Sequence, residues 1–112
     1  MNLLSIGGSD PSSGAGIQSD IKTFAALNAY GFSVITAVTS QNSSSFGEIE
    51  PIPIKMVKSQ LEAIISDFSI DAIKIGMVYN SKIIKVIYKE LKKIHVPIIL
   101  DPIIKSTTGG LL

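Results

Sequence analysis

A glycine-rich segment at residues 7–16 (GGSDPSSGAG) is the part of the sequence best suited to binding an anion. It precedes a stretch with helical periodicity, and such loops offer backbone N–H groups and the positive end of a helix. Neither common phosphate motif fits. No lysine follows a glycine as in a Walker A loop, and Ser19 stands where a dinucleotide fingerprint starting at Gly14 needs its third glycine. A tight turn of small residues explains the segment equally well.

Other polar or flexible side chains follow the remaining expected strands, at the sheet edge where parallel sheets bind ligands. Gln41 and Asn42 donate and accept hydrogen bonds at once, which suits the edge of a nitrogen heterocycle. Met77 can stack on a flat ring, Asp101 can hold a magnesium ion or its waters, and Asp20 is expected to point back toward the glycine-rich loop. Each has a structural alternative, such as a turn, core filling or the helix dipole. Together they predict a pocket.

Short apolar stretches alternate with segments of helical periodicity, which predicts an α/β fold with a mostly parallel sheet and helices on its faces. The expected strands are residues 3–6, 33–38, 70–75 and 96–100, and the expected helices are residues 17–27, 54–68 and 81–94. The strands at 33–38 and 96–100 lack clean alternation, which is typical of strands buried on both faces. The longest irregular stretch, residues 41–53, is a candidate lid. A Gly-Gly-Leu-Leu terminus soon after the last strand indicates a sheet that is incomplete on its C-terminal side.

The composition excludes several classes of site and partner. The 112 residues carry 10 basic and 9 acidic side chains and are 46% hydrophobic, as expected of one globular domain. The lack of cysteine excludes disulfides and a cysteine nucleophile, and a lone His95 excludes a histidine metal cluster within one chain. All basic residues are lysines and the charge is balanced, so nucleic acid is not an expected partner. No apolar run approaches the roughly 20 residues of a membrane span and no signal peptide is recognisable, which predicts a cytoplasmic protein.

Four segments resemble the hydroxymethylpyrimidine/phosphomethylpyrimidine kinases of thiamine biosynthesis. They are residues 7–24 (GGSDPSSGAGIQSDIKTF), 31–42 (GFSVITAVTSQN), 74–77 (KIGM) and 101–104 (DPII), in the family's order and across essentially the whole chain. The resemblance implies a three-layer ribokinase-like fold. It also implies that Mg-ATP phosphorylates 4-amino-5-hydroxymethyl-2-methylpyrimidine and then its monophosphate. ATP is thus the expected co-substrate, Mg²⁺ the expected cofactor and a pyrimidine alcohol the expected small-molecule partner.

The same resemblance implies roles for five substrate-binding residues. Gln41 would hydrogen-bond the aminopyrimidine edge, with the Thr39 backbone beside it. Gly8 and Asp20 would lie near the ring or its hydroxymethyl group, and Met77 would pack on the ring.

Toward the end of the chain the resemblance implies a metal position but no catalytic residue. Asp101 would lie toward the magnesium ion and the phosphates, and residues 107–109 (TTG) would form a small-residue segment after it. Members of the family are more than twice as long, and their second half supplies the anion hole, the catalytic base and most of the nucleotide pocket. Residues 1–112 would therefore be the N-terminal, substrate-binding part of a kinase domain. A homo-oligomer or a complementing C-terminal chain would supply the rest.

Three alternatives stay open on the sequence. One is a catalytically inactive fragment that binds a pyrimidine without turnover. Another is part of a pyridoxal-type vitamin kinase, which shares the amino-terminal motifs. The third is a non-functional fragment that associates with itself through an uncovered sheet edge.

Overall fold

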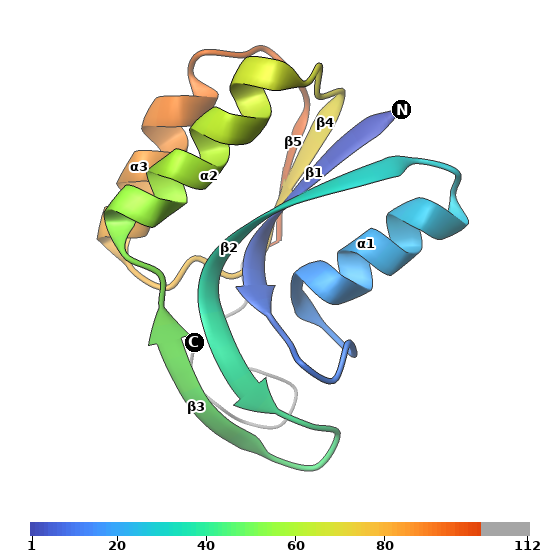
Figure 1. The fold of residues 1–112 in the computed structure, drawn as a ribbon, viewed down its shortest axis with the longest axis vertical. Coiled ribbons are helices and arrows are strands. Elements are labelled where there is room, and N and C mark those ends of the chain that lie inside the picture. Colours follow the sequence, from blue (N-terminus) through green and yellow to red (C-terminus); the bar gives the residue numbers. More distant parts are fainter. Residues whose placement is uncertain (102–112) are drawn as a thin grey trace.

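The computed structural model describes residues 1–101, which form a five-stranded sheet with helices on both faces (Figure 1). In chain order the elements are β1 (Asn2–Ser9), α1 (Gly16–Ala26), β2 (Tyr30–Gln41), β3 (Phe46–Pro51), α2 (Ile54–Asp67), β4 (Ala72–Ile75), α3 (Ser81–Leu91) and β5 (Ile98–Leu100). The strand order is β3-β2-β1-β4-β5, and each neighbouring pair is parallel except β2 with β3. One helix, α1, covers β1 and β2, while α2 and α3 pack together on the other side. The predicted α/β class is confirmed.

The main core lies between the sheet and the pair of helices α2 and α3. Alternate residues of the inner strands point into it, because successive side chains of a strand face opposite sides of the sheet. The helices contribute apolar residues about one turn apart, which places them on a single face. The most deeply buried members of this core are Leu4, Ile6, Val34, Val57, Leu61, Ile73 and Ile83.

Residues 41–53, predicted to be irregular, are mostly regular, so that part of the prediction was wrong, and their role as a lid stays a prediction. β2 continues to Gln41, and β3 runs back beside it as an antiparallel edge strand. The Asn42 carboxamide oxygen closes the turn by accepting a hydrogen bond from the Ser45 N–H at 2.9 Å. The sequence conceals β3 because an edge strand carries exposed polar side chains, here two glutamates, in place of a regular apolar alternation.

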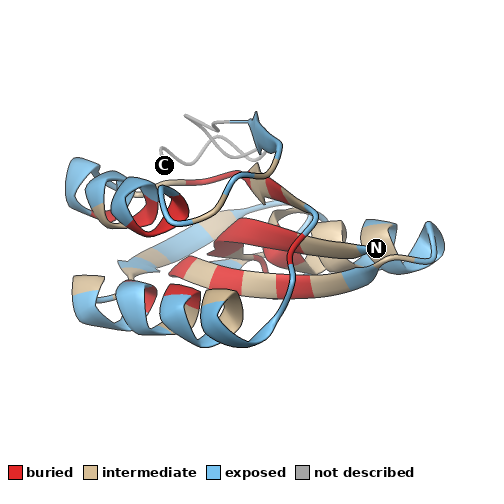
Figure 2. Ribbon diagram, turned by 90° about the horizontal axis from the view of Figure 1, so that it is seen from above, coloured by how far each residue is buried: buried red, intermediate tan, exposed pale blue. Residues whose placement is uncertain are grey.

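β5 lies at the opposite edge of the sheet and is exposed, which corrects the expectation that residues 96–100 are buried on both faces. Ile98, Ile99 and Leu100 expose 46%, 63% and 65% of their surface, and the strand is pale blue in Figure 2. Within residues 1–101 only β4 pairs with β5. A strand with the apolar sequence of an interior strand therefore forms the edge of the described sheet.

The remaining predicted elements match the observed ones to within a few residues, and β1 extends to Ser9 inside the glycine-rich segment. Among residues 1–101 no helix has both the length and the hydropathy required to cross a membrane. The small-residue segment predicted at residues 107–109 lies outside the described residues.

Candidate functional site

The carboxyl ends of β1, β2 and β4 bring several predicted site residues together. Gly8 of β1 lies against Met77, which follows β4, and a Cβ atom at position 8 would overlap the Met77 Cε atom. The fully buried Thr36 hydroxyl of β2 donates a hydrogen bond to the Met77 carbonyl oxygen at 2.9 Å. The missing side chain at Gly8 thus makes room for Met77, and Thr36 fixes the backbone that carries it.

A second group of hydrogen bonds holds Gln41 at the end of β2. Its Nε2 donates to the Thr39 Oγ1 at 2.9 Å, and the Thr39 hydroxyl in turn donates to the Ser9 carbonyl oxygen at 2.7 Å. Within residues 1–101 the Gln41 Oε1 and the second Nε2 hydrogen have no hydrogen-bond partner. The amide is therefore oriented by one contact and free to make others.

The glycine-rich loop between β1 and α1 is organised by the buried Asp10, which the sequence-based reasoning did not single out. Its Oδ1 accepts hydrogen bonds from the backbone N–H and the hydroxyl of Ser12 at 2.8 and 2.7 Å, and its Oδ2 accepts from the Ala15 N–H at 2.9 Å. Burial by itself raises the pKa of the Asp10 carboxyl, but these hydrogen bonds together outweigh burial and hold its pKa below the ordinary value. An ionised Asp10 thus fixes the loop.

The same loop closes onto the first helix. The Gln18 carboxamide accepts from the Asp10 N–H at 2.8 Å and donates to the Ser9 hydroxyl at 2.7 Å. Gly16 has a φ of 66°, and a Cβ atom there would overlap the Gly8 carbonyl oxygen. Several backbone N–H groups of the loop thus already donate hydrogen bonds to the Asp10 and Gln18 side chains. This favours a loop that forms one wall of the site over a loop that binds a phosphate with its N–H groups.

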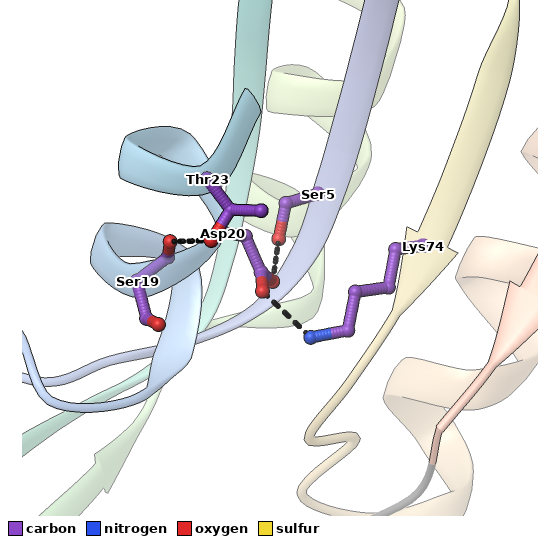
Figure 3. A network of polar contacts seen from close by, with 5 residues as sticks. All are labelled: Ser5, Ser19, Asp20, Thr23 and Lys74. Carbon is purple, nitrogen blue, oxygen red and sulfur yellow. Dashed lines mark hydrogen bonds and ion pairs between the residues drawn. The ribbon is translucent and has the colours of Figure 1, made fainter. Parts of the chain in front are cut away.

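Asp20 is not brought into this group. Its carboxylate lies between α1 and the sheet, where Oδ2 accepts from the Ser5 hydroxyl at 2.7 Å and Oδ1 accepts from the Lys74 Nζ at 2.7 Å (Figure 3). The Asp20 and Lys74 side chains are 15% and 29% exposed. The expected orientation toward the glycine-rich loop is replaced by a network that ties α1 to β1 and β4.

Asp101 follows β5 at the carboxyl ends of the strands, and this residue is exposed. Its backbone N–H donates to the Ile75 carbonyl oxygen at 2.9 Å, so the residue continues the ladder between β4 and β5. In the described part of the chain no group of three or more His, Cys, Asp or Glu side chains gathers in a way that holds a metal ion. Asp101 thus offers a single carboxylate.

Two residues of the site, Asp10 and Thr36, were missed for identifiable reasons. Asp10 was grouped with its small neighbours, although an Asp followed by Pro and Ser is a common loop-forming signal. Thr36 lies in an apolar, largely β-branched run, where a threonine is explained by its preference for strands alone. Only the folded structure, which brings Thr36 next to the segment after β4, reveals that its hydroxyl supports Met77.

The mostly parallel sheet with helices on both faces is an α/β fold, and its likeness to solved kinase structures places it in the ribokinase-like class, seen here in part. A sequence model of the phosphomethylpyrimidine kinase family matches residues 10–112, and the chain belongs to that family.

Three similar proteins are described below, and each is longer than this chain. The hydroxymethylpyrimidine/phosphomethylpyrimidine kinase of Rhizobium meliloti is 43% identical over 97% of this chain, which spans 41% of that relative. The crystal structure of a phosphomethylpyrimidine kinase from Clostridium difficile 630 matches all of this chain and 49% of its own, with 45% identity and a TM-score of 0.90. The pyridoxal kinase of Staphylococcus aureus, solved with AMP-PCP and pyridoxal, is 34% identical with a TM-score of 0.80 over 89% of this chain and 38% of its own.

Proposed function

We propose that this chain forms the pyrimidine-binding part of a kinase that uses ATP to phosphorylate 4-amino-5-hydroxymethyl-2-methylpyrimidine and then its monophosphate. The observation that carries the proposal is the Gln41 amide, which Thr39 orients at the sheet edge. Its Oε1 can accept from the exocyclic amino group while the remaining Nε2 hydrogen donates to the adjacent ring nitrogen. A neutral amide that both donates and accepts matches the edge of an aminopyrimidine.

Gly8 and Met77 are proposed to form the apolar wall against which the ring packs. The thioether of Met77 is polarisable and makes favourable contacts with aromatic rings. The close contact between the two residues and the hydrogen bond from Thr36 support this, because they hold Met77 at the strand end.

For Asp20 the geometry favours support of the site over direct contact with the ligand. Its carboxylate is engaged by Ser5 and Lys74, and these residues belong to the strands whose ends carry Gly8 and Met77. We therefore assign Asp20 to fixing α1 against β1 and β4.

Asp101 is proposed to hold Mg²⁺ at the edge next to β4. One carboxylate fits this ion, because Mg²⁺ usually keeps several waters and takes further ligands from nucleotide phosphates. When bound, it would neutralise phosphate charge during transfer. The structure of the Staphylococcus aureus pyridoxal kinase with AMP-PCP supports ATP as the co-substrate.

Complete activity is proposed for this chain together with the remainder of the kinase domain. The chain spans 41% of the length of its Rhizobium meliloti relative and 49% of the Clostridium difficile chain. Phosphoryl transfer depends on positioning and charge neutralisation, and the part of the kinase domain that these 112 residues do not include would supply the groups for both. We expect the isolated chain to bind the pyrimidine without substantial turnover.

Isothermal titration calorimetry with the pyrimidine alcohol tests the binding role. The Gln41→Ala variant should weaken binding by about 5- to 150-fold, equivalent to about 1–3 kcal/mol, because a polar ligand edge loses its partner. Glu50→Ala, an exposed change on the facing strand β3, is the matched control and should leave affinity unchanged. Equal affinities for the parent chain and Gln41→Ala would remove Gln41 from the site.

A pyridoxal-type substrate is the second candidate, favoured by the likeness to the Staphylococcus aureus enzyme. The same titration with pyridoxal separates the two. Tighter binding of pyridoxal than of the aminopyrimidine would assign the chain to that substrate class, whereas the reverse order supports the pyrimidine.

A further inference from the structure

The Thr39 hydroxyl at the end of β2 has one way to place its hydrogen. It lies 2.7 Å from the Ser9 carbonyl oxygen, and a carbonyl oxygen accepts hydrogen bonds but cannot donate them. The hydroxyl must therefore donate to Ser9. Thr39 is 6% exposed, which limits the access of water to this group. Its oxygen is left as an acceptor that faces the Gln41 amide, 2.9 Å from Nε2.

This acceptor decides which end of the Gln41 amide faces Thr39. The two ends of a carboxamide have nearly the same shape but opposite hydrogen-bonding character. With Nε2 toward Thr39, the amide donates to the hydroxyl oxygen. With Oε1 there instead, either two oxygen lone pairs would face each other or the hydroxyl would have to leave the Ser9 carbonyl, and each alternative loses a hydrogen bond. The outward edge of the amide therefore presents Oε1 and the second Nε2 hydrogen in a fixed order.

The glycine-rich loop and α1 hold the residue whose carbonyl starts this series of contacts. Ser9 ends β1, and its hydroxyl accepts a hydrogen bond from the Gln18 Nε2 at 2.7 Å. The Gln18 Oε1 accepts in turn from the Asp10 N–H at 2.8 Å. Hydrogen bonds thus connect the loop through Ser9 and Thr39 to Gln41. The orientation of the amide is set by the protein before any ligand binds.

We propose that Thr39 is a positioning residue whose hydroxyl, acting through the Gln41 amide, selects a 4-aminopyrimidine over its 4-oxo counterpart. The aminopyrimidine presents a donor at its amino group and an acceptor at the adjacent ring nitrogen. The oxo counterpart presents an acceptor at its carbonyl and a donor at that nitrogen, so it needs the amide turned by half a rotation. The selectivity rests on the proposed function, in which Gln41 binds the pyrimidine edge, whereas the orientation of the amide rests on the contacts of Thr39 alone.

Calorimetry with two ligands tests the selectivity. The chain is titrated with 4-amino-5-hydroxymethyl-2-methylpyrimidine and with the analogue that carries an oxo group in place of the amino group. The parent chain should prefer the amino compound by at least about tenfold. Thr39→Val keeps the shape of the side chain but frees the amide to turn, and should lower this preference by at least about fivefold. A purely structural role for Thr39 would weaken both ligands equally and leave the preference unchanged.

Two further variants identify the hydroxyl as the cause. Thr39→Ser keeps the hydroxyl and should retain the preference of the parent chain. Thr23→Val is the matched control, because the exposed Thr23 hydroxyl also donates to a backbone carbonyl, that of Ser19 within α1. This control should change neither affinity. Circular dichroism confirms that each variant is folded.

Nuclear magnetic resonance of the chain without ligand tests the orientation separately. A nuclear Overhauser effect between the Gln41 Nε2 protons and the Thr39 side chain is expected, since Nε2 lies 2.9 Å from Oγ1. Its absence would overturn the proposal, as would an unchanged preference in Thr39→Val or a preference lost in Thr39→Ser. If neither ligand binds the parent chain, the proposed function and the selectivity are both rejected, while the resonance experiment still decides how the amide is oriented.

Discussion

The ion pair between Asp20 and Lys74 should contribute substantially to the free energy of unfolding by holding α1 against the sheet. Lys74→Met keeps the aliphatic stem but leaves the Asp20 carboxylate, 15% exposed, with the Ser5 hydroxyl as its one remaining partner among residues 1–101. Exposed pairs contribute at most about 1 kcal/mol, and breaking a fully buried pair costs about 3–5 kcal/mol. For this intermediate burial we expect Lys74→Met to cost about 2 kcal/mol. In a domain of this size that lowers Tm by about 8 °C.

A double-mutant cycle isolates the interaction. Asp20→Asn, Lys74→Met and the combined variant are unfolded in urea at neutral pH, and we expect a coupling free energy of about 1–2 kcal/mol. Lys58→Met, the same substitution at an exposed position of α2, is the control and should change stability by less than about 0.5 kcal/mol. A coupling free energy below about 0.5 kcal/mol would refute this interaction, because the two substitutions would then act independently.

Two further predictions concern the glycine-rich loop. Gly16→Ala should cost at least about 2 kcal/mol in urea unfolding, since it combines a φ of 66° with overlap on the Gly8 carbonyl. Gly14→Ala, whose Cβ would lie 3.7 Å from the nearest atom, should cost far less, and equal costs would contradict this reasoning. Asp10→Asn should destabilise the chain by about 1–2 kcal/mol at pH 7. Because the folded-state pKa of Asp10 lies below its ordinary value of 3.8, the wild-type advantage is present above that pH. The advantage is lost as pH falls through the folded-state pKa, and a difference that stays constant from pH 7 to pH 2 would argue against an ionised Asp10.

Much of the fold was predictable because its inner strands and helices carry strong local patterns. Leu4, Ile6 and Val34 lie in short, largely apolar runs, and the apolar residues of the helices recur at one-turn intervals, so the type of each element follows from this spacing. The edges of the sheet were not predictable. β3 lacks an apolar pattern because water covers much of it, and β5 has an interior pattern although it is exposed.

The sequence predicted which residues form the site better than it predicted the hydrogen bonds and ion pairs between them. Gly8, Met77 and Gln41 follow strand ends in the sequence, and parallel topology brings such ends together. The ion-pair partner of Asp20 could not be predicted from the sequence, because Lys74 lies 54 residues away and their contact depends on the register of β4 against β1. Thr36 was hidden for the same reason, since its acceptor lies 41 residues later.

The central position of β1 has a consequence for synthesis of the chain. Its neighbours are β2, which follows after one helix, and β4, and the contact between Asn2 and Asp71 beside that second ladder spans 69 residues. During translation the first edge of β1 can be paired early by a local βαβ unit, but the second has no partner until β4 leaves the ribosome. The amino-terminal strand, the most buried of the five described strands, is therefore half-paired while much of the chain is still being made.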